Sequence, residues 1–328
     1  MRWFAAVLLV IVLGAPAAAQ VAPPSSPLEA ADHAVVLVAV LTESGGRLVR
    51  GSGSGIIIES DGLILTANHV IARAQQIDVT LWTGETMRAR VVGTDPVYDA
   101  ALIKVDARLP LPTAALGSSS LLQPGSILTA LGRSPRRRAG PTSGTFLETD
   151  VEARPGIPHV RASAVVWPGD SGGALINDRG EVIGLIVAIT RDGAVSLSVA
   201  MDAIRQHLSD LRAGFVRHPW LGVMGITITD QVVAELGLAT SGGVLILEVV
   251  EGGPAALAGL RGGRAAGPRD IPRGGDVIVA MDGHRVTTFG ALAAYVLSRR
   301  IGDAVTLELI RDGQPFSTTV VLGERPGI

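Results

Sequence analysis

The stretch Trp167-Pro-Gly-Asp-Ser-Gly-Gly-Ala-Leu175 places one serine, Ser171, in a tight turn that is rich in glycine. Glycines let the chain adopt backbone angles that other residues avoid, and they let a substrate approach the backbone closely. Backbone N–H groups beside the serine can then point towards a developing oxyanion. Such a turn is also typical of a solvated loop, so a catalytic interpretation needs partners elsewhere in the chain.

Two further segments supply the partners that a nucleophilic serine needs, which are a base and an acid that orients the base. His69 follows the apolar run Leu63–Ala67 after one residue, and Asp99 directly precedes the apolar run Ala100–Val105. The order His69, Asp99, Ser171 is that of chymotrypsin and differs from the orders of subtilisin and the α/β-hydrolases. The three residues together predict acyl transfer.

A second acidic residue competes for the orienting role. Asp95 lies four residues before Asp99 and is followed by Pro96. A position before proline suits a turn residue, whereas Asp99 enters the apolar run directly. We therefore expect Asp99 to be the acid of the triad.

The run Gly51-Ser-Gly-Ser-Gly-Ile-Ile-Ile-Glu-Ser-Asp-Gly-Leu-Ile-Leu-Thr-Ala-Asn-His-Val70 resembles the start of the HtrA/Deg family of serine proteases. The runs at 99–105, 130–135 and 180–185 agree with it, and the resemblance covers roughly residues 33–325. It implies an ATP-independent serine endopeptidase with one peptide-binding PDZ domain, assembled as a trimer or a multiple of one. Asp170 and Ala174 depart from the family, which usually has Asn before the serine and Pro after the two glycines.

From residue 33 to 213 the chain consists of short apolar or alternating runs separated by Gly, Asp and Pro, which is typical of strands. Two groups of about six strands predict a mostly β, chymotrypsin-like double barrel, with the triad at the junction of the barrels. A helix over Met201–Leu211 should close this domain. The predicted strands are His33–Leu41, Ser54–Ile58, Leu63–Leu65, Ile77–Trp82, Arg88–Gly93, Ala101–Val105, Ser126–Leu131, Thr145–Thr149, Val160–Val166, Gly173–Asn177, Val182–Ile189 and Ala194–Val199.

The oxyanion hole and the pocket for the side chain before the cleaved bond follow from this fold. Backbone N–H groups of Gly169 and Ser171, with Asp170 as a further candidate, should stabilise the oxyanion. Val165 and Val166 just before the turn, and Ile186 opposite, predict a pocket without a carboxylate. A small or aliphatic substrate side chain is expected there, although these residues could equally fill the barrel core.

Asp170 supports two interpretations. It could pair with an arginine and so order the oxyanion loop, or it could simply accept hydrogen bonds from backbone amides. The candidate arginines are Arg133, Arg136, Arg137, Arg138 and Arg161.

A second domain is expected over residues 217–325. Pro219 marks its start, and Leu221-Gly-Val223 resembles the carboxylate-binding loop of HtrA-type PDZ domains. A predicted helix over Thr288–Arg299 should face the peptide groove with Leu292, Tyr295 and Val296. An extended C-terminus would add to the sheet as a strand while Leu221, Gly222 and Val223 hold its carboxylate.

The N-terminus predicts export. Residues 1–19 combine a basic residue, a short apolar run and the small residues Ala17–Ala19, as in a secretory signal peptide cleaved after Ala19. An uncleaved membrane anchor is the alternative. Residues 20–32 should form a flexible leader. The absence of cysteine excludes disulfides and suits a periplasmic protein that depends on its core.

The remaining composition excludes several function classes. The 28 basic and 30 acidic residues give a formal net charge of −2, so nucleic acid is not an expected partner. No metal-spaced His/Cys cluster and no phosphate-binding loop occurs, so we expect no metal and no cofactor. The remaining histidines, His33, His159, His207, His218 and His284, are expected to be structural or exposed. The arginine-rich segment 261–273 is interpreted as a solvated loop, with contact to an acidic peptide or a neighbouring subunit as the alternative.

Two function classes follow from these observations. The first is a secreted serine endopeptidase that cleaves unfolded or damaged proteins and uses its PDZ domain to capture or regulate substrates. The second is a catalytically silent peptide-binding or holdase protein on a protease fold. The complete set of Ser, His and Asp favours the first.

Overall fold

The computed structural model describes residues 24–135, 140–189, 195–238, 240, 242–264, 267 and 271–327. The signal peptide expected at 1–19 lies outside the described residues. The flexible leader expected at 20–32 is wrong in its second half, because helix α1 (Pro27–His33) begins there. The Ser26 side chain accepts a hydrogen bond from Glu29 N, and Pro27 stands at the first helical position, so both features of a helix start are present.

The first barrel is a closed sheet of six antiparallel strands in the order β1-β2-β3-β6-β5-β4. Its inward side chains are the apolar residues of the predicted runs, such as Ile56, Ile64 and Leu102, which are fully buried. The strands are β1 (Val35–Ser44), β2 (Arg47–Glu59), β3 (Leu63–Ala67), β4 (Ala74–Thr80), β5 (Thr86–Asp95) and β6 (Ala100–Val105). The short helix α2 (Asn68–Ile71) follows β3 directly.

The second barrel is also closed, in the order β10-β11-β12-β9-β8-β7. Its strands are β7 (Ile127–Leu131), β8 (Thr142–Asp150), β9 (His159–Ala162), β10 (Ala174–Ile176), β11 (Val182–Ile189) and β12 (Ser196–Ala200). A 3-10 turn, η1 (Ser119–Leu121), precedes it, and helix α3 (Met201–Ala213) closes the domain. The double barrel predicted from the sequence is therefore present, and its strand β9 ends earlier than expected.

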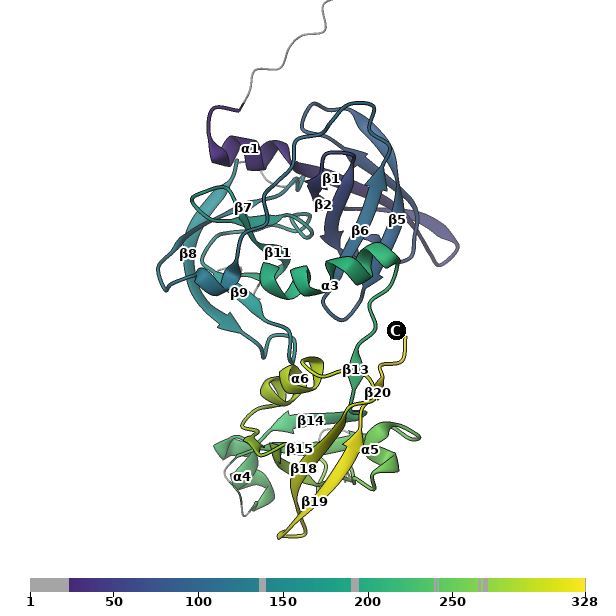
Figure 1. The fold of residues 1–328 in the computed structure, drawn as a ribbon, viewed down its shortest axis with the longest axis vertical. Coiled ribbons are helices and arrows are strands. Elements are labelled where there is room, and N and C mark those ends of the chain that lie inside the picture. Colours follow the sequence, from purple (N-terminus) through teal and green to yellow (C-terminus); the bar gives the residue numbers. More distant parts are fainter. Residues whose placement is uncertain are drawn as a thin grey trace, which may run out of the picture.

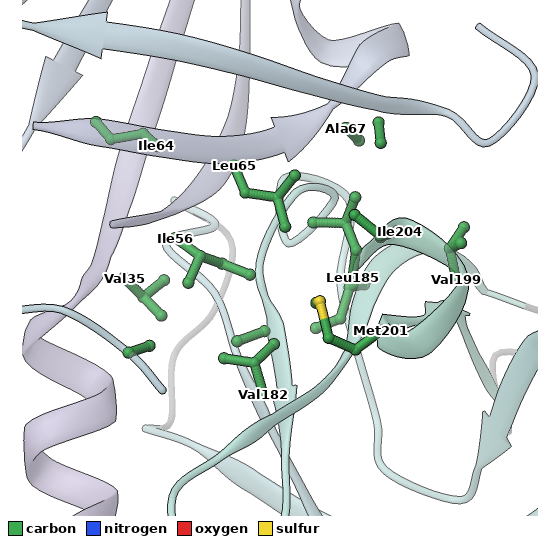
Figure 2. Close-up of a cluster of buried hydrophobic side chains, with 14 of the residues drawn as sticks. Val35, Ile56, Ile64, Leu65, Ala67, Val182, Leu185, Val199, Met201 and Ile204 are labelled. Carbon is green, nitrogen blue, oxygen red and sulfur yellow. The ribbon is translucent and has the colours of Figure 1, made fainter. Parts of the chain in front are cut away.

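The two barrels share one hydrophobic core. Figure 2 shows Ile56 and Leu65 of the first barrel lying towards Leu185 and Val182 of the second, with Met201 of α3 beside them. All five side chains are fully or almost fully buried. Because the core is continuous, the barrels are held at a fixed orientation, and loops at their junction can position catalytic groups.

The C-terminal domain is built on a five-stranded path, β14-β15-β16-β18-β19, with β17 paired to β16. Figure 1 shows α6 on the side of this domain that faces the two barrels. The strands are β14 (Val223–Thr227), β15 (Val244–Val249), β16 (Val277–Met281), β17 (His284–Arg285), β18 (Ala304–Arg311) and β19 (Gln314–Val321). The helices are α4 (Asp230–Leu236), α5 (Pro254–Leu257) and α6 (Phe289–Leu297).

A small two-stranded sheet joins the domains. Strand β13 (Pro219–Trp220) pairs with β20 (Gly323–Glu324), so the linker and the C-terminal segment lie side by side between the barrels and the second domain (Figure 1). Among the described residues, every helix is too short or too polar to cross a membrane.

Candidate active site

Asp99 holds His69 from two directions. Its Oδ1 accepts the backbone N–H of His69 at 2.9 Å, and its Oδ2 lies 2.7 Å from His69 Nδ1. Asp99 has a left-handed backbone with φ of 54°, in the turn between β5 and β6, and its C=O accepts from Asn68 N at 3.0 Å. These contacts fix α2 against the turn. They leave Nε2 of a half-exposed imidazole facing away from the acid, as a general base requires.

Ser171 lies in the loop between β9 and β10 and packs against the first barrel. Its C=O accepts from Ser54 N at 2.7 Å. A Cβ added to Gly53 would lie 2.9 Å from that same oxygen and 2.6 Å from Val70, the neighbour of His69. The bare backbone of Gly53 therefore lets the serine turn approach the histidine helix. Among the described residues, the His69 ring makes its side-chain hydrogen bond to Asp99 and none to Ser171.

The backbone of the serine turn narrows the candidates for the oxyanion hole. Gly169 has φ of +105°, and neither its N–H nor that of Ser171 donates to another described residue. The N–H of Asp170 donates to the Trp167 C=O at 2.9 Å. The inclusion of Asp170 among the oxyanion donors is therefore wrong, because the turn already uses its N–H. Gly169 and Ser171 remain.

The Asp170 side chain is completely buried and supports the turn from inside. It accepts from Trp167 N at 2.8 Å and from Ser134 N at 3.3 Å, as the backbone-capping interpretation expects. Of the candidate arginines, Arg133 pairs with Asp32 at 2.9 Å and Arg161 with Glu148 at 2.6 Å. Arg136, Arg137 and Arg138 lie outside the described residues.

Asp95 binds a different histidine. Its Oδ1 lies 2.9 Å from His218 Nε2 and also accepts the N–H groups of Val97 and Tyr98. Both members of the pair are buried, with side-chain exposures of 0% for Asp95 and 3% for His218. Asp95 therefore shapes the turn that ends at Asp99 and joins it to the interdomain linker, and it makes no contact with His69.

Tyr98 and His207 complete this buried cluster. The Tyr98 ring centroid lies 4.7 Å from that of His207 and 5.3 Å from that of His218. Burial raises the pKa of Tyr98 to about 12, with the Asp95 charge adding to the effect. Burial also lowers the pKa of His207. Two histidines that the sequence left scattered are thus brought together, and nothing in their local sequence signals it.

The three candidates for the specificity pocket differ in their surroundings. Val166 and Ile186 are almost fully buried, whereas the Val165 side chain is 42% exposed. Ile186 exchanges backbone hydrogen bonds with the serine loop, since its N–H donates to Gly173 O at 2.9 Å and its C=O accepts from Gly172 N at 2.7 Å. Ile186 therefore lies beside the turn that carries Ser171.

The loop expected to bind a carboxylate borders a groove on the second domain. The groove has a volume of about 470 Å³ and lies between β14 and α6, with Leu221, Gly222 and Val223 at one end. Leu292 and Val296 line it as expected. Tyr295 does not. Its hydroxyl donates to Asp282 at 3.2 Å. The expectation that Tyr295 faces the groove is therefore wrong, because consecutive residues of a helix point in different directions and the neighbouring Val296 faces the groove instead.

The loop after β8 connects the groove to the triad. Glu152 accepts from Thr288 Oγ1 at 2.6 Å and from Gly290 N at 3.3 Å, which caps the N-terminus of α6. Arg154 on the same loop donates to Pro96 O at 2.8 Å, and its Nη1 lies 3.9 Å from Asp99 Oδ2. Sequence reasoning missed these residues because the loop carries no local motif.

Comparison with known proteins agrees with this architecture. A model of the trypsin-like peptidase domain matches residues 53–185, and a model of the PDZ domain matches residues 222–322. A probable periplasmic serine endoprotease, DegP-like, from Pseudomonas putida is 35% identical over 294 residues, which cover 85% of this chain and 57% of that protein. The chain thus spans a little over half the length of that relative.

In two further matches, the aligned region covers a larger share of the matched protein. The putative serine protease HhoA of Synechocystis is 35% identical over 291 residues, covering 84% of this chain and 71% of that protein. The structure of the HtrA-type protease AlgW with a decapeptide superposes with a TM-score of 0.75 at 26% identity, covering 94% of this chain and all of that one. With a trypsin-like double barrel, a single PDZ domain and relatives of this similarity, the chain belongs to the HtrA/Deg family of serine proteases.

Proposed function

We propose that this protein is a serine endopeptidase that cleaves unfolded or damaged proteins without ATP, with Ser171, His69 and Asp99 as its catalytic residues. The observation that carries the proposal is the double contact of Asp99 with His69, at 2.9 Å to the backbone and 2.7 Å to the ring. A carboxylate held in this way selects the tautomer whose Nε2 can accept the serine proton. The name of the Pseudomonas putida relative, a serine endoprotease, agrees with it.

The chemistry follows from these positions. Ser171 Oγ attacks the substrate carbonyl carbon while His69 Nε2 takes the hydroxyl proton, and Asp99 stabilises the imidazolium. The N–H groups of Gly169 and Ser171 would bind the oxyanion, and each such donor is worth roughly 10²–10³ in kcat. His69 then gives its proton to the leaving amine, and water releases the acyl group by the same steps in reverse order.

Specificity should be set by Val165, Val166 and Ile186. In the proposed pocket Val165 is half-exposed while Val166 and Ile186 pack behind it, and none of the three carries a carboxylate, so Val, Ala, Ile or Leu should precede the cleaved bond. Mass spectrometry of the fragments of a protein substrate would test this. Cleavage mainly after Arg or Lys would overturn it.

The PDZ domain should capture extended C-terminal peptides. The N–H groups of Leu221 and Gly222 donate to no other described residue, whereas their C=O groups are fixed by Ala255 N and Val250 N at 2.9 Å each. Such a loop is rigid and presents N–H groups to a carboxylate, and β14 offers an edge for strand addition. The HtrA-type neighbour AlgW is described with a bound decapeptide.

We also infer that the protein works in the periplasm after removal of residues 1–19, and that it assembles as a trimer or a multiple of one. The export inference rests on the N-terminal sequence, and relatives bear the name periplasmic. N-terminal sequencing of the mature protein should begin at Gln20, whereas an intact Met1 in a membrane fraction would favour an uncleaved anchor. Light scattering would measure the assembly, and a monomeric mass would overturn the trimer.

The alternative function is a catalytically silent peptide-binding or holdase protein. Labelled, unfolded β-casein at neutral pH without ATP separates the two. The wild type should cleave it, Ser171→Ala should not, and the exposed Ser209→Ala should match the wild type. If the wild type stays inactive even with added C-terminal peptides, the silent binding protein is the better description.

A further inference from the structure

The PDZ groove has a distinctive charge pattern. Its lining is apolar, glycine or proline except for two residues, Arg154 from the protease domain and Arg325 from the C-terminal segment. No acidic residue lines the groove within the described part of the chain. An apolar groove with two cations and no anion is complementary to a ligand with an apolar end and negative charge.

Arg154 reaches the groove from the protease side. The bare backbone of Gly156 packs on α6, where an added Cβ would lie 2.7 Å from the backbone of Ala293, so the loop bearing Arg154 forms one side of the groove. Arg154 is anchored to Pro96 O and lies 3.9 Å from Asp99. The separation from Asp99 is too long for a hydrogen bond, so Nη1 of Arg154 is left to bind a ligand.

Arg325 lines the groove at the end where Leu221, Gly222 and Val223 lie. Its backbone N–H donates to His218 O at 2.9 Å, which places it just beyond the pairing of β20 with β13. The Arg325 guanidinium makes no hydrogen bond or ion pair with another described residue. Burial lowers the pKa of Arg325, and the nearby charge of Arg154 lowers it further while that of Asp95 raises it, so the two guanidinium groups lie close enough to repel each other.

We propose that this groove selects C-terminal peptides that carry Asp or Glu next to an apolar terminal residue, with Arg154 and Arg325 binding the acidic side chain. In a peptide that adds to β14 as a strand, successive side chains point to opposite faces. The terminal side chain would enter the apolar floor formed by Leu292 and Val296. The side chain of the penultimate peptide residue would then point towards the loop bearing Arg154. The inference rests on PDZ peptide capture.

The test uses the full chain with Ser171→Ala, which prevents cleavage, and fluorescence anisotropy of short labelled peptides. The peptides share one sequence and an apolar terminal residue, and differ only in Glu, Gln or Lys at the penultimate position. A fourth peptide has Glu and an amidated terminus. The Glu peptide should bind about tenfold more tightly than the Gln peptide, as for a hydrogen bond to a charged group, and the Lys peptide should bind more weakly than both.

Variants assign the effect to the arginines. Arg325→Gln should reduce the Glu-over-Gln ratio towards one, Arg325→Lys should keep part of it, and Arg325→Glu should favour the Lys peptide. The control is Arg299→Gln just after the end of α6, where the guanidinium stacks on Tyr295 and does not line the groove, so the ratio should not change. Thermal melts of each variant show whether the fold is intact.

The outcomes separate the two claims. If the Glu and Gln peptides bind equally and amidation weakens both, peptide capture stands and the acidic preference is overturned. If amidation has no effect, or if no peptide binds, PDZ capture itself fails and the preference fails with it. An unchanged ratio in Arg325→Glu would show that the preference arises elsewhere and would overturn the assignment to Arg325.

Discussion

Asp95 Oδ1 lies 2.9 Å from His218 Nε2, and this buried pair ties the turn that presents Asp99 to the linker that leads into the PDZ domain. The same oxygen accepts the N–H groups of Val97 and Tyr98, so one carboxylate shapes the turn and holds the linker. The domain junction and the triad therefore share a structural element.

Removing His218 should destabilise the protease domain strongly. His218→Ala leaves Asp95 buried without its ring partner, and breaking a buried pair in this way costs about 3–5 kcal/mol. Urea unfolding of the full chain measures the loss. The exposed pair Arg88–Asp78 provides the control, since Arg88→Ala should cost less than about 1 kcal/mol. Equal losses in the two variants would contradict a structural role for the buried pair.

Asp170→Asn should reduce kcat by at least about tenfold, because an amide side chain has one oxygen that accepts hydrogen bonds whereas the carboxylate has two. Asp170 accepts backbone N–H groups at both carboxylate oxygens, and the amide NH₂ would face one of these donors. The turn bearing Gly169 should then loosen and lose oxyanion stabilisation. Initial rates of casein cleavage by folded variant and wild type provide the measurement. An unchanged rate would mean that the turn holds its shape without this carboxylate.

Gly53→Ala should impair catalysis by displacing the serine turn. The added Cβ would lie 2.6 Å from two carbons of Val70 and 2.9 Å from Ser171 O, which is too close for any real contact. Overpacking of this kind typically costs about 1–3 kcal/mol, here at the boundary between histidine and serine. Gly140→Ala is the matched control, because no other described residue lies within 4 Å of its added Cβ. Similar kcat values for both variants would refute the close approach at Gly53.

Tyr98 should make the protein less stable in alkali. Burial raises its pKa to about 12 from the ordinary 10.0, so the unfolded chain releases the proton first. The unfolded state binds fewer protons between these values, and the free energy of unfolding should fall as pH rises from about 10 to about 12. The loss amounts to about 2–3 kcal/mol. Tyr98→Phe, compared by urea unfolding across this range, should remove that part of the slope. A slope identical to wild type would contradict the burial effect.

The sequence could predict the features that depend on local pattern. Alternating apolar runs indicated the strands of both barrels, and the turn residues around Ser171 and the position of Asp99 indicated the site. Pro96 marks Asp95 as a turn residue and so favours Asp99 as the acid, and the contacts of Asp99 with His69 agree.

The remaining features depend on contacts between segments far apart in the sequence. The pairing of Asp95 with His218 spans 123 positions, and that of Glu152 with Thr288 spans 136. Neither pair has a repeat, a spacing or a motif that signals it. The helix α1 was missed for a different reason. Pro and Ser at residues 23–27 are typical of a flexible leader, but Ser26 and Pro27 also form the start of a helix.

If Ser171 is a nucleophile activated by His69, a fluorophosphonate probe should react with it. The serine oxygen forms a bond to phosphorus, and fluoride leaves. After digestion with trypsin, the peptide Ala162–Arg179 contains two serines, Ser163 and Ser171, so fragmentation by mass spectrometry can identify the labelled one. We expect an adduct on Ser171 in the wild type and none in His69→Ala. An adduct on Ser163, equal labelling in both proteins, or no adduct even with casein present would contradict this expectation.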